Sequence, residues 1–376
     1  MSSQFLRIEM GKALHGDCLF VEWGGPAERH RMLIDGGPIG AYEELSRRMA
    51  ELSDEERQFE LIALTHVDTD HIEGAVRLLA EPRDRWPFRV KDVWFNGWHH
   101  MNGVLGGRQG EFFSALLTHR LPVGAWNNAF GSEAVVVPPE GPLPFAVLRG
   151  DMKLTLLSPT PSKLEKMRDA WRKDLKKSGI KPGDIDAAWE ELSGQKRYLP
   201  DEGLMSSSDS DIANLLKAQF KPDKAAANGA SIAFLAEHAA GSCLFLADAH
   251  PDAIVASLKR LLQERRIDRL VVDAVKVAHH GSKNNTSEEL LGLIDSPRYL
   301  FSSNGAQFQH PDEETVARVL DKAGGRQLEL HFNYHTDFNK RWEDADLQKQ
   351  RNYQAFYNKA ETGPLVLNLG ATPTRS

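Results

Sequence analysis

The sequence predicts an α/β fold in which sheets are layered with helices. Short apolar runs of strand length alternate with stretches of helical periodicity, and several apolar runs end directly in polar clusters. Strand ends of this kind are where ligands usually bind in α/β sheets. At 376 residues, with 41% hydrophobic and 26% charged residues, the chain has the composition of a folded globular protein.

The first third of the chain predicts a meander followed by alternating helices and strands. Three strand-length runs bounded by turn residues come first, namely QFLRIEM, CLFVEWGG and RMLIDGG. Residues 40–53 have apolar positions at helical spacing, and FELIALTH after them is an apolar run suited to a strand buried on both faces. Beyond it we predict a helix in IEGAVRLLAE, a strand in VKDVWFNG and a helix in GEFFSALLTHRL.

The second half predicts further strands and two insertions. ASIAFLAEH and SCLFLADAH resemble a hairpin, and later strands are expected in DAVKVAHHG, RYLFSSNG and GPLVLNLG. A charged stretch with helical apolar spacing lies between them and the first third of the chain. We therefore expect one domain over residues 1–376, with helical insertions at about 162–218 and 338–360.

The cysteine content and the length of the apolar runs exclude some classes of protein. Cys18 and Cys243 lie in apolar runs, which predicts core residues and neither a disulfide framework nor a thiolate metal site. No signal-peptide pattern opens the chain and no apolar run approaches the roughly 20 residues of a membrane span, so we expect no membrane association and a cytoplasmic location.

The net charge of −7 argues against broad attraction to nucleic acid. Residues 163–181 are the exception, with eight Lys or Arg against three acids. They form either a solvated helix face or a local nucleic-acid contact.

Four side chains that can bind metal follow the apolar run LIALT within six residues: His66, Asp68, Asp70 and His71. His66 and Asp68 can point the same way from an extended segment, while the other two turn with the chain toward a second position. Imidazole and carboxylate suit Zn²⁺, Mn²⁺ or Fe. The alternative is a solvated acidic turn whose histidines cap the next helix.

Two other strand ends repeat this pattern and favour a metal site. CLFLAD ends at Asp248, and VKVAHHGS places His279 and His280 after an apolar strand. Three strands that run into metal-binding side chains are difficult to explain as solvated turns.

These motifs together resemble those of metallo-β-lactamase-fold hydrolases. THVDTDHIEG is similar to the HxHxDH motif with Asp in place of the middle His, and RMLIDGG is similar to the early Asp-Gly motif at Asp35. LFLADAH resembles the motif of the bridging Asp, and VAHHGSK the late His motif. HVDTDH, HHGSK and SSNGAQFQHP look most like the ComEC-type subgroup, whose best-known members carry the nuclease-like domain of competence DNA-uptake proteins. The resemblance covers nearly the whole chain and implies a four-layered αββα metallo-β-lactamase fold with helical insertions.

The resemblance also implies two divalent metal ions, with Zn²⁺ expected and Mn²⁺ as its competitor because the ligands include carboxylates. His66 and Asp68 would bind one ion. Asp70 and His71 would bind the other, and Asp248 would bridge both. The late ligand is either His279 or His280, and the remaining one of the two would face the substrate or support a ligand.

The same resemblance implies supporting roles for other residues. Asp35 would hold the free imidazole N–H of a ligand, and His310 would lie at the mouth of the site and touch an anionic group of the substrate. Ser282 and Lys283 would be further phosphate contacts. Asp70 or Asp248 would orient an attacking hydroxide, while a late histidine such as His310 steadies the developing oxyanion.

One ligand of the wider family has no clear counterpart, namely the middle histidine. His99, His100 and His119 come too early in the chain. The loop SSSDSD offers Asp209 or Asp211, unless it is a solvated loop.

Three functions follow. The first is metal-dependent hydrolysis of a phosphodiester, in nucleic acid or in a smaller anionic phosphoester. The second keeps the metal site but acts on a carboxylic ester, lactone or thioester. The third is a metal-stabilised interaction module that binds a protein partner through the helical insertions.

Overall fold

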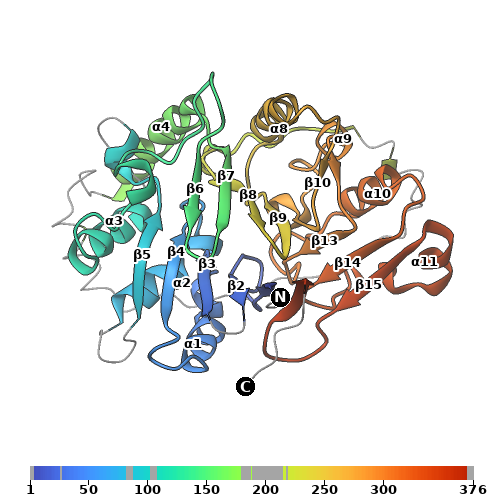
Figure 1. Cartoon of the computed structure of the whole chain (residues 1–376), viewed down its shortest axis with the longest axis horizontal. Coiled ribbons are helices and arrows are strands. Elements are labelled where there is room, and N and C mark those ends of the chain that lie inside the picture. Colours follow the sequence, from blue (N-terminus) through green and yellow to red (C-terminus); the bar gives the residue numbers. More distant parts are fainter. Residues whose placement is uncertain are drawn as a thin grey trace.

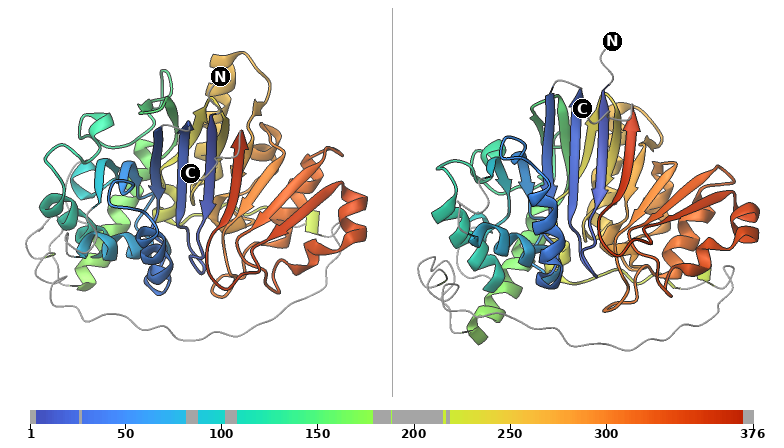
Figure 2. Two further views of the ribbon diagram at one scale, coloured as in Figure 1. Left: turned by 60° about the horizontal axis from the view of Figure 1, so that its bottom comes forward. Right: turned by 90° about the horizontal axis from the view of Figure 1, so that it is seen from below.

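Two sheets packed face to face form the centre of the molecule, and helices cover their outer faces (Figures 1 and 2). The computed structural model describes residues 4–25, 28–81, 88–101, 108–178 and 219–370, with Ala188, Leu215 and Leu216. Within these residues, one sheet has six strands and the other has eight. The predicted α/β class and its four αββα layers are therefore confirmed.

The six-stranded sheet combines both ends of the chain. Its strands are, in spatial order, β16 (Leu365–Gly370), β1 (Phe5–Met10), β2 (Leu19–Gly25), β3 (Glu28–Ile34), β4 (Gln58–Ala63) and β5 (Arg89–Trp94). The predicted antiparallel meander is present as β1, β2 and β3, whereas β3, β4 and β5 are parallel. β4 is buried on both faces, as its continuous apolar run predicts.

The eight-stranded sheet is antiparallel at one end and parallel at the other. Its strands are, in spatial order, β15 (Tyr353–Tyr357), β14 (Leu328–Phe332), β13 (Arg298–Phe301), β11 (Ala274–Lys276), β9 (Gly241–Phe245), β8 (Ala233–His238), β7 (Met152–Ser158) and β6 (Phe145–Leu148). The hairpin of β8 and β9 agrees with the sequence prediction. β10 (Leu270–Val271) and β12 (Ile294–Asp295) form a separate short pair.

The helices divide between the two outer faces (Figure 1). Those beside the six-stranded sheet are α1 (Tyr42–Ala50), α2 (Thr69–Ala80) and α3 (Arg108–Arg120). Those beside the eight-stranded sheet are α8 (Pro251–Arg265), α9 (Glu288–Gly292) and α10 (Glu313–Lys322). The remaining helices are α4 (Pro161–Ser178), α7 (Ala226–Gly229), α11 (Ala345–Arg351) and the 3-10 helices η1 (Ile39–Ala41), η2 (Trp98–Met101), η3 (Asn128–Phe130), η4 (Ala278–Gly281) and η5 (Lys340–Glu343).

Alternation along the strands explains the layering. Met32 and Ile34 of β3 pack in the core between the sheets, while Leu33 packs with the helices on the other face. Trp94 of β5 meets Phe234 of β8 edge to face at 5.9 Å, which joins the two sheets directly. The apolar inner faces therefore fix how the sheets are stacked.

The two cysteines are buried and free, as predicted. Among the described residues, no helix combines the length and the apolar character that a membrane span requires.

The two predicted insertions differ in structure. The first begins with α4, and most of its remainder lies outside the described residues. The second contains η5 and α11, but it also contains β15, a strand that the helical prediction for 338–360 did not include. β15 pairs in parallel with β14 and so extends the eight-stranded sheet.

Strand direction brings several loops to one edge of the sandwich. β9, β11 and β13 are adjacent and parallel, so the segments that follow them begin side by side. In the facing sheet β3 and β4 are also parallel neighbours. The loops after these five strands carry most of the side chains described below.

Replacing Phe234 with Ala should lower the free energy of unfolding by about 3–5 kcal/mol, because this fully buried ring packs between the sheets. Phe145, in the same sheet but 57% exposed, provides the control. Phe145→Ala should cost less than about 1 kcal/mol in the same denaturant titration. Equal losses in the two variants would contradict the assignment of the inter-sheet core.

Candidate metal centre

The segment between β4 and α2 supplies the first group of side chains. His66 lies in the extended segment after β4, whereas α2 begins at Thr69 and holds Asp70 and His71 in its first turn. Gly16 packs against this turn so closely that an added Cβ would lie 1.8 Å from the carbonyl oxygen of Asp70. Only glycine fits there, and the first turn of α2 is held against the loop that precedes β2.

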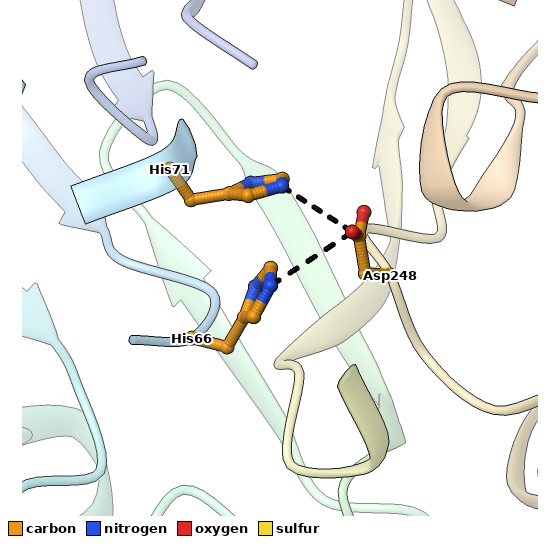
Figure 3. A group of neighbouring side chains, drawn as sticks. All are labelled: His66, His71 and Asp248. Atoms are coloured by element: carbon orange, nitrogen blue, oxygen red, sulfur yellow. Dashed lines mark ion pairs between the residues drawn. The ribbon is translucent and has the colours of Figure 1, made fainter. Parts of the chain in front are cut away.

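Asp248, in the loop after β9, faces this segment from the other sheet. Its Oδ2 lies 3.8 Å from His66 Nε2 and 3.4 Å from His71 Nε2. Figure 3 shows the two imidazole rings directed at the same carboxylate. Oδ2 is also 3.5 Å from His279 Nε2 and 3.8 Å from His280 Nε2. One oxygen atom is therefore shared by four imidazole nitrogens.

A second set of close atoms joins His280 to the first turn of α2. Its Nε2 lies 3.2 Å from His71 Nε2 and 3.6 Å from Asp70 Oδ2. His280 is completely buried, whereas the side chain of His279 is 20% exposed. Of the two late histidines, His280 is thus the one enclosed with Asp70 and His71, and His279 faces the open side.

Asp35 orients two of the histidines at once. Its Oδ2 accepts hydrogen bonds from His71 Nδ1 at 2.8 Å and from the Thr65 hydroxyl at 2.8 Å. The Thr65 hydroxyl in turn accepts from His66 Nδ1 at 3.0 Å. The predicted contact between Asp35 and an imidazole N–H is therefore present, and it reaches His66 through Thr65.

The two late histidines are held in the same manner. His280 Nδ1 donates to the carbonyl oxygen of Ser302 at 2.8 Å, and His279 Nδ1 donates to Asn285 Oδ1 at 2.9 Å. Each imidazole with its proton on Nδ1 presents a free electron pair at Nε2 when neutral. Outer contacts of this kind are what orient histidine ligands toward a metal.

The polar atoms of the cluster would be better satisfied by a bound metal cation than they are by one another. In the neutral state His71 and His280 would direct two electron pairs at each other across 3.2 Å, which is repulsive unless a proton or a metal ion lies between them. His66 Nε2 and Asp248 Oδ1 are buried and make no hydrogen bond. Unsatisfied buried groups cost about 1–3 kcal/mol each, a cost that coordination would remove. His66, His71 and Asp248 could hold one ion, and Asp70, His71 and His280 are a second group of suitable spacing.

The charges of the cluster compensate one another. Burial alone would lower the pKa of His280, but Asp248 and Asp17 outweigh it and raise that pKa to about 9. Burial would likewise raise the pKa of Asp248, yet the surrounding histidines hold it well below its usual range. In the metal-free protein, protons bound to the histidines therefore supply the positive charge that metal ions would supply.

Several residues of this centre have an unusual backbone conformation. Asp35, Ala247, His279 and His280 all have positive φ, between 46° and 57°. Residues with a Cβ adopt this left-handed region at a cost, and such residues concentrate at functional sites. The cost is met here by contacts such as the hydrogen bond from His279 N to Ala247 O at 2.8 Å.

Asp68 lies at the open side, and His310 is buried beside His279. Asp68 Oδ2 is 3.6 Å from His66 Nε2, and its side chain is 42% exposed. The His310 ring lies 5.5 Å from the His279 ring, and its Nδ1 is buried with no hydrogen bond. Burial together with His279 and His280 lowers the pKa of His310 to about 3, so this ring is neutral. Both residues are therefore next to the centre.

Ser282 and Lys283, the predicted phosphate contacts, both have partners within the protein. The Ser282 hydroxyl accepts a hydrogen bond from the backbone N–H of Asn284. The Lys283 ammonium lies 2.8 Å from Glu314 Oε1 on α10. The second of these contacts directs the Lys283 charge toward α10.

The three groups of suitable spacing for a metal ion among the described residues include none of the earlier histidines, His99, His100 and His119. His100 accepts a hydrogen bond from the Gly97 N–H and lies 3.3 Å from Asn127, and its ring is tilted against that of His99, with the ring centroids 3.7 Å apart. Asp209 and Asp211 lie outside the described residues. Pocket residues beside His66 include Leu164 of α4 and Met167, so an apolar wall adjoins this side of the centre.

Sequence reasoning missed two supports of the late histidines. Asp17 is buried, forms an ion pair with Lys276 at 2.7 Å, and has its Oδ1 3.5 Å from His280 Nδ1. Lys276 interrupts an otherwise apolar strand, and a lysine in that position must have a buried partner, which is the signal that could have indicated Asp17.

The other missed support is Asp223, with Asn285. Asp223 Oδ2 is 3.5 Å from His279 Nδ1 and accepts a hydrogen bond from Asn285 Nδ2 at 3.1 Å. Asn285 also donates to the carbonyl oxygen of Asp248 at 3.1 Å, which ties the loop after β9 to the loop after β11. No sequence pattern identifies Asp223, because it follows the first insertion without a motif.

Comparisons with known proteins give limited information. No family model matches the chain, and no curated protein matches its sequence. Among solved structures, the chain is similar to the metallo-beta-lactamase fold protein YhfI from Bacillus subtilis, at 10% identity and a TM-score of 0.37, over 97% of this chain and 99% of that one. Residue roles in this chain therefore rest on its own side-chain geometry.

Replacing Asp35 with Asn should weaken metal binding about 10- to 100-fold, because His71 and His66 lose the acceptor that orients them. Calorimetric titration of metal-free protein with Zn²⁺ and with Mn²⁺ measures this loss. Asp92→Asn is the matched control, since Asp92 is a buried carboxylate of the same sheet that accepts the Asn128 and Ala129 N–H groups. Similar losses in both variants would contradict the role of Asp35.

The metal-free protein should lose stability in alkali. The folded pKa of His280, about 9, exceeds the unfolded value near 6.5, so its stabilising charge is fully present below about pH 6.5 and is lost as the pH rises through 9. The free energy of unfolding should fall by up to about 3 kcal/mol over that range. Chelator-treated protein unfolded by denaturant at several pH values tests this.

Bound metal should flatten this pH dependence, because the ions replace the protons. His335→Gln, which removes a histidine that pairs with Glu343 at 3.0 Å, should leave the slope of the metal-free protein unchanged. A metal-free stability that is constant or rises between pH 6.5 and 9 would argue against the charged cluster.

Proposed function

We propose that this protein is a metal-dependent hydrolase whose centre holds two divalent cations. The observation that supports this most directly is the shared oxygen of Asp248, which lies within 3.8 Å of four imidazole nitrogens contributed by both sheets. A stabilising element alone has no need of an opening, whereas here Asp68 and His279 border an accessible side.

Two ligand groups are proposed around Asp248. His66 and Asp68 form the first, and Asp70, His71 and His280 form the second. Divalent cations in such a pair supply Lewis acidity and a nucleophile derived from water near neutral pH. Zn²⁺ suits the histidines, and Mn²⁺ competes because of the carboxylates.

The remaining residues prepare the site for an incoming substrate. Asp248 and Asp70 remain ionised, since nearby histidines hold the pKa of both carboxyl groups below the usual range. Each can therefore accept a proton or orient a water molecule. His310 is neutral and can donate one hydrogen bond to an oxygen that gains negative charge at the open side.

A phosphodiester is the substrate that we propose. His279 faces the opening, and although burial alone would lower its pKa, the carboxylate of Asp248 raises it. With His310 beside it at 5.5 Å, two imidazole groups are available to anionic oxygens. The net charge of −7 favours a small phosphodiester or a short strand over long nucleic acid.

A carboxylic ester, lactone or thioester is the second candidate. One observation favours it: the Lys283 ammonium, three residues after the late histidines, is paired with Glu314. A neutral substrate has no need of that charge. The two candidates differ in the charge of the substrate and share the same centre.

Activity measurements separate these candidates. Metal-loaded protein should hydrolyse bis(p-nitrophenyl) phosphate faster, relative to the uncatalysed rates, than p-nitrophenyl acetate. Asp248→Asn should reduce that activity by more than about a hundredfold, and metal content measured by elemental analysis should fall with it.

Asp273→Asn is the matched control. Asp273 precedes β11, at the strand end opposite to His279, and accepts hydrogen bonds from Ser242. This variant should keep both metal and activity. A wild-type protein that binds no metal yet folds normally would favour an interaction module and contradict the proposal, whereas preference for the acetate would select the second candidate.

A further inference from the structure

Phe308 is an exposed aromatic side chain beside the candidate metal centre. It lies in the segment between β13 and α10 and is 47% exposed. A single exposed apolar side chain is common on protein surfaces, so the position of this ring beside the centre, and not its exposure alone, suggests a role.

Contacts with two imidazole rings show where Phe308 lies relative to the metal centre. Its ring stacks on that of His310 at 6.1 Å with an interplanar angle of 29°, and His310 in turn lies 5.5 Å from His279. Phe308 also meets His15 edge to face at 6.1 Å. His15 is close enough to Asp70, His71 and His280 for their charges to act on it. Phe308 thus borders the open side of the centre.

The segment that carries Phe308 is held firmly. The backbone N–H of Ser303 donates to Asn333 Oδ1 at 3.0 Å, and that of Asn304 donates to the carbonyl oxygen of Leu14 at 2.8 Å, next to His15. Gly305 has φ of +72°, and an added Cβ would lie 2.2 Å from the ring of Phe338. The exposed ring is therefore presented by an ordered turn, which lowers the entropy cost of stacking a ligand on it.

We propose that Phe308 is a stacking platform for a planar aromatic group attached to the scissile phosphodiester, namely the base of a nucleotide. This inference rests on the proposed hydrolase function and names its substrate class. Every nucleobase has a π-face, so an aromatic side chain selects for a base without selecting its identity. His279 and His310 would contact the phosphate while Phe308 stacks on the base.

The test compares two substrates that share a leaving group. The p-nitrophenyl ester of thymidine 5′-monophosphate carries a base, whereas methyl p-nitrophenyl phosphate carries none. Phe308→Ala should lower the ratio of their kcat/KM values by about fivefold to a hundredfold, because base stacking on an aromatic side chain contributes about that much. The loss should appear in KM for the nucleotide ester, and Phe308→Trp should restore the ratio.

Phe356→Ala is the matched control. Phe356 is also exposed, at 38%, and stacks on a histidine ring, His331, at 4.8 Å. It lies on β15, the edge strand of the eight-stranded sheet. If the ratio of the two kcat/KM values is unchanged in Phe356→Ala and reduced in Phe308→Ala, the platform is supported. If the two variants have equal ratios, the platform is overturned.

A binding measurement separates this inference from the proposed function. The metal-loaded protein is titrated with thymidine 5′-monophosphate and, separately, with inorganic phosphate. Selective loss of nucleotide affinity in Phe308→Ala supports the platform even when neither ester is hydrolysed, a result that would contradict only the hydrolase. Equal loss for both ligands, or no binding of the nucleotide by the wild-type protein, would overturn the platform.

Discussion

The oxygen atom of Asp248 that faces four imidazoles is the constraint on which the rest of the centre depends. A carboxylate is stable in the protein interior only when opposite charge lies close to it. Each histidine is therefore held by its Nδ1, through Asp35, Thr65, Ser302 or Asn285. These outer acceptors fix the direction of every Nε2, and the arrangement needs cations, either protons or metal ions, to be balanced.

The sequence predicted the local parts of this arrangement well. His66, Asp70 and His71 could be recognised because they stand together after one apolar strand, and Asp248 because it ends another. Strand patterns of period 2 and continuous apolar runs predicted the meander, β4 and the hairpin of β8 and β9. Such features depend on residues that are close together in the sequence, and periodicity is informative only over such short stretches.

Contacts between distant segments could not be predicted in the same way. Asp17 supports His280 across more than two hundred and fifty residues, together with Lys276, and Asp223 reaches His279 from the end of an insertion. The direction of Lys283 toward Glu314 also depends on how α10 packs. His279 and His280 are adjacent in sequence and are the same residue type, so the distinction between them required the three-dimensional arrangement.

The centre is split between two parts of the chain, and this has a consequence for biosynthesis. His71 and His280 face each other although 209 residues separate them. During translation the first group of ligands emerges long before its counterpart, so a nascent chain cannot enclose a cation until the loop after β11 has been made. A metal ion held by the proposed ligands would join the two sheets as a cross-link does. Metal loading would then require that both halves of the chain have been made.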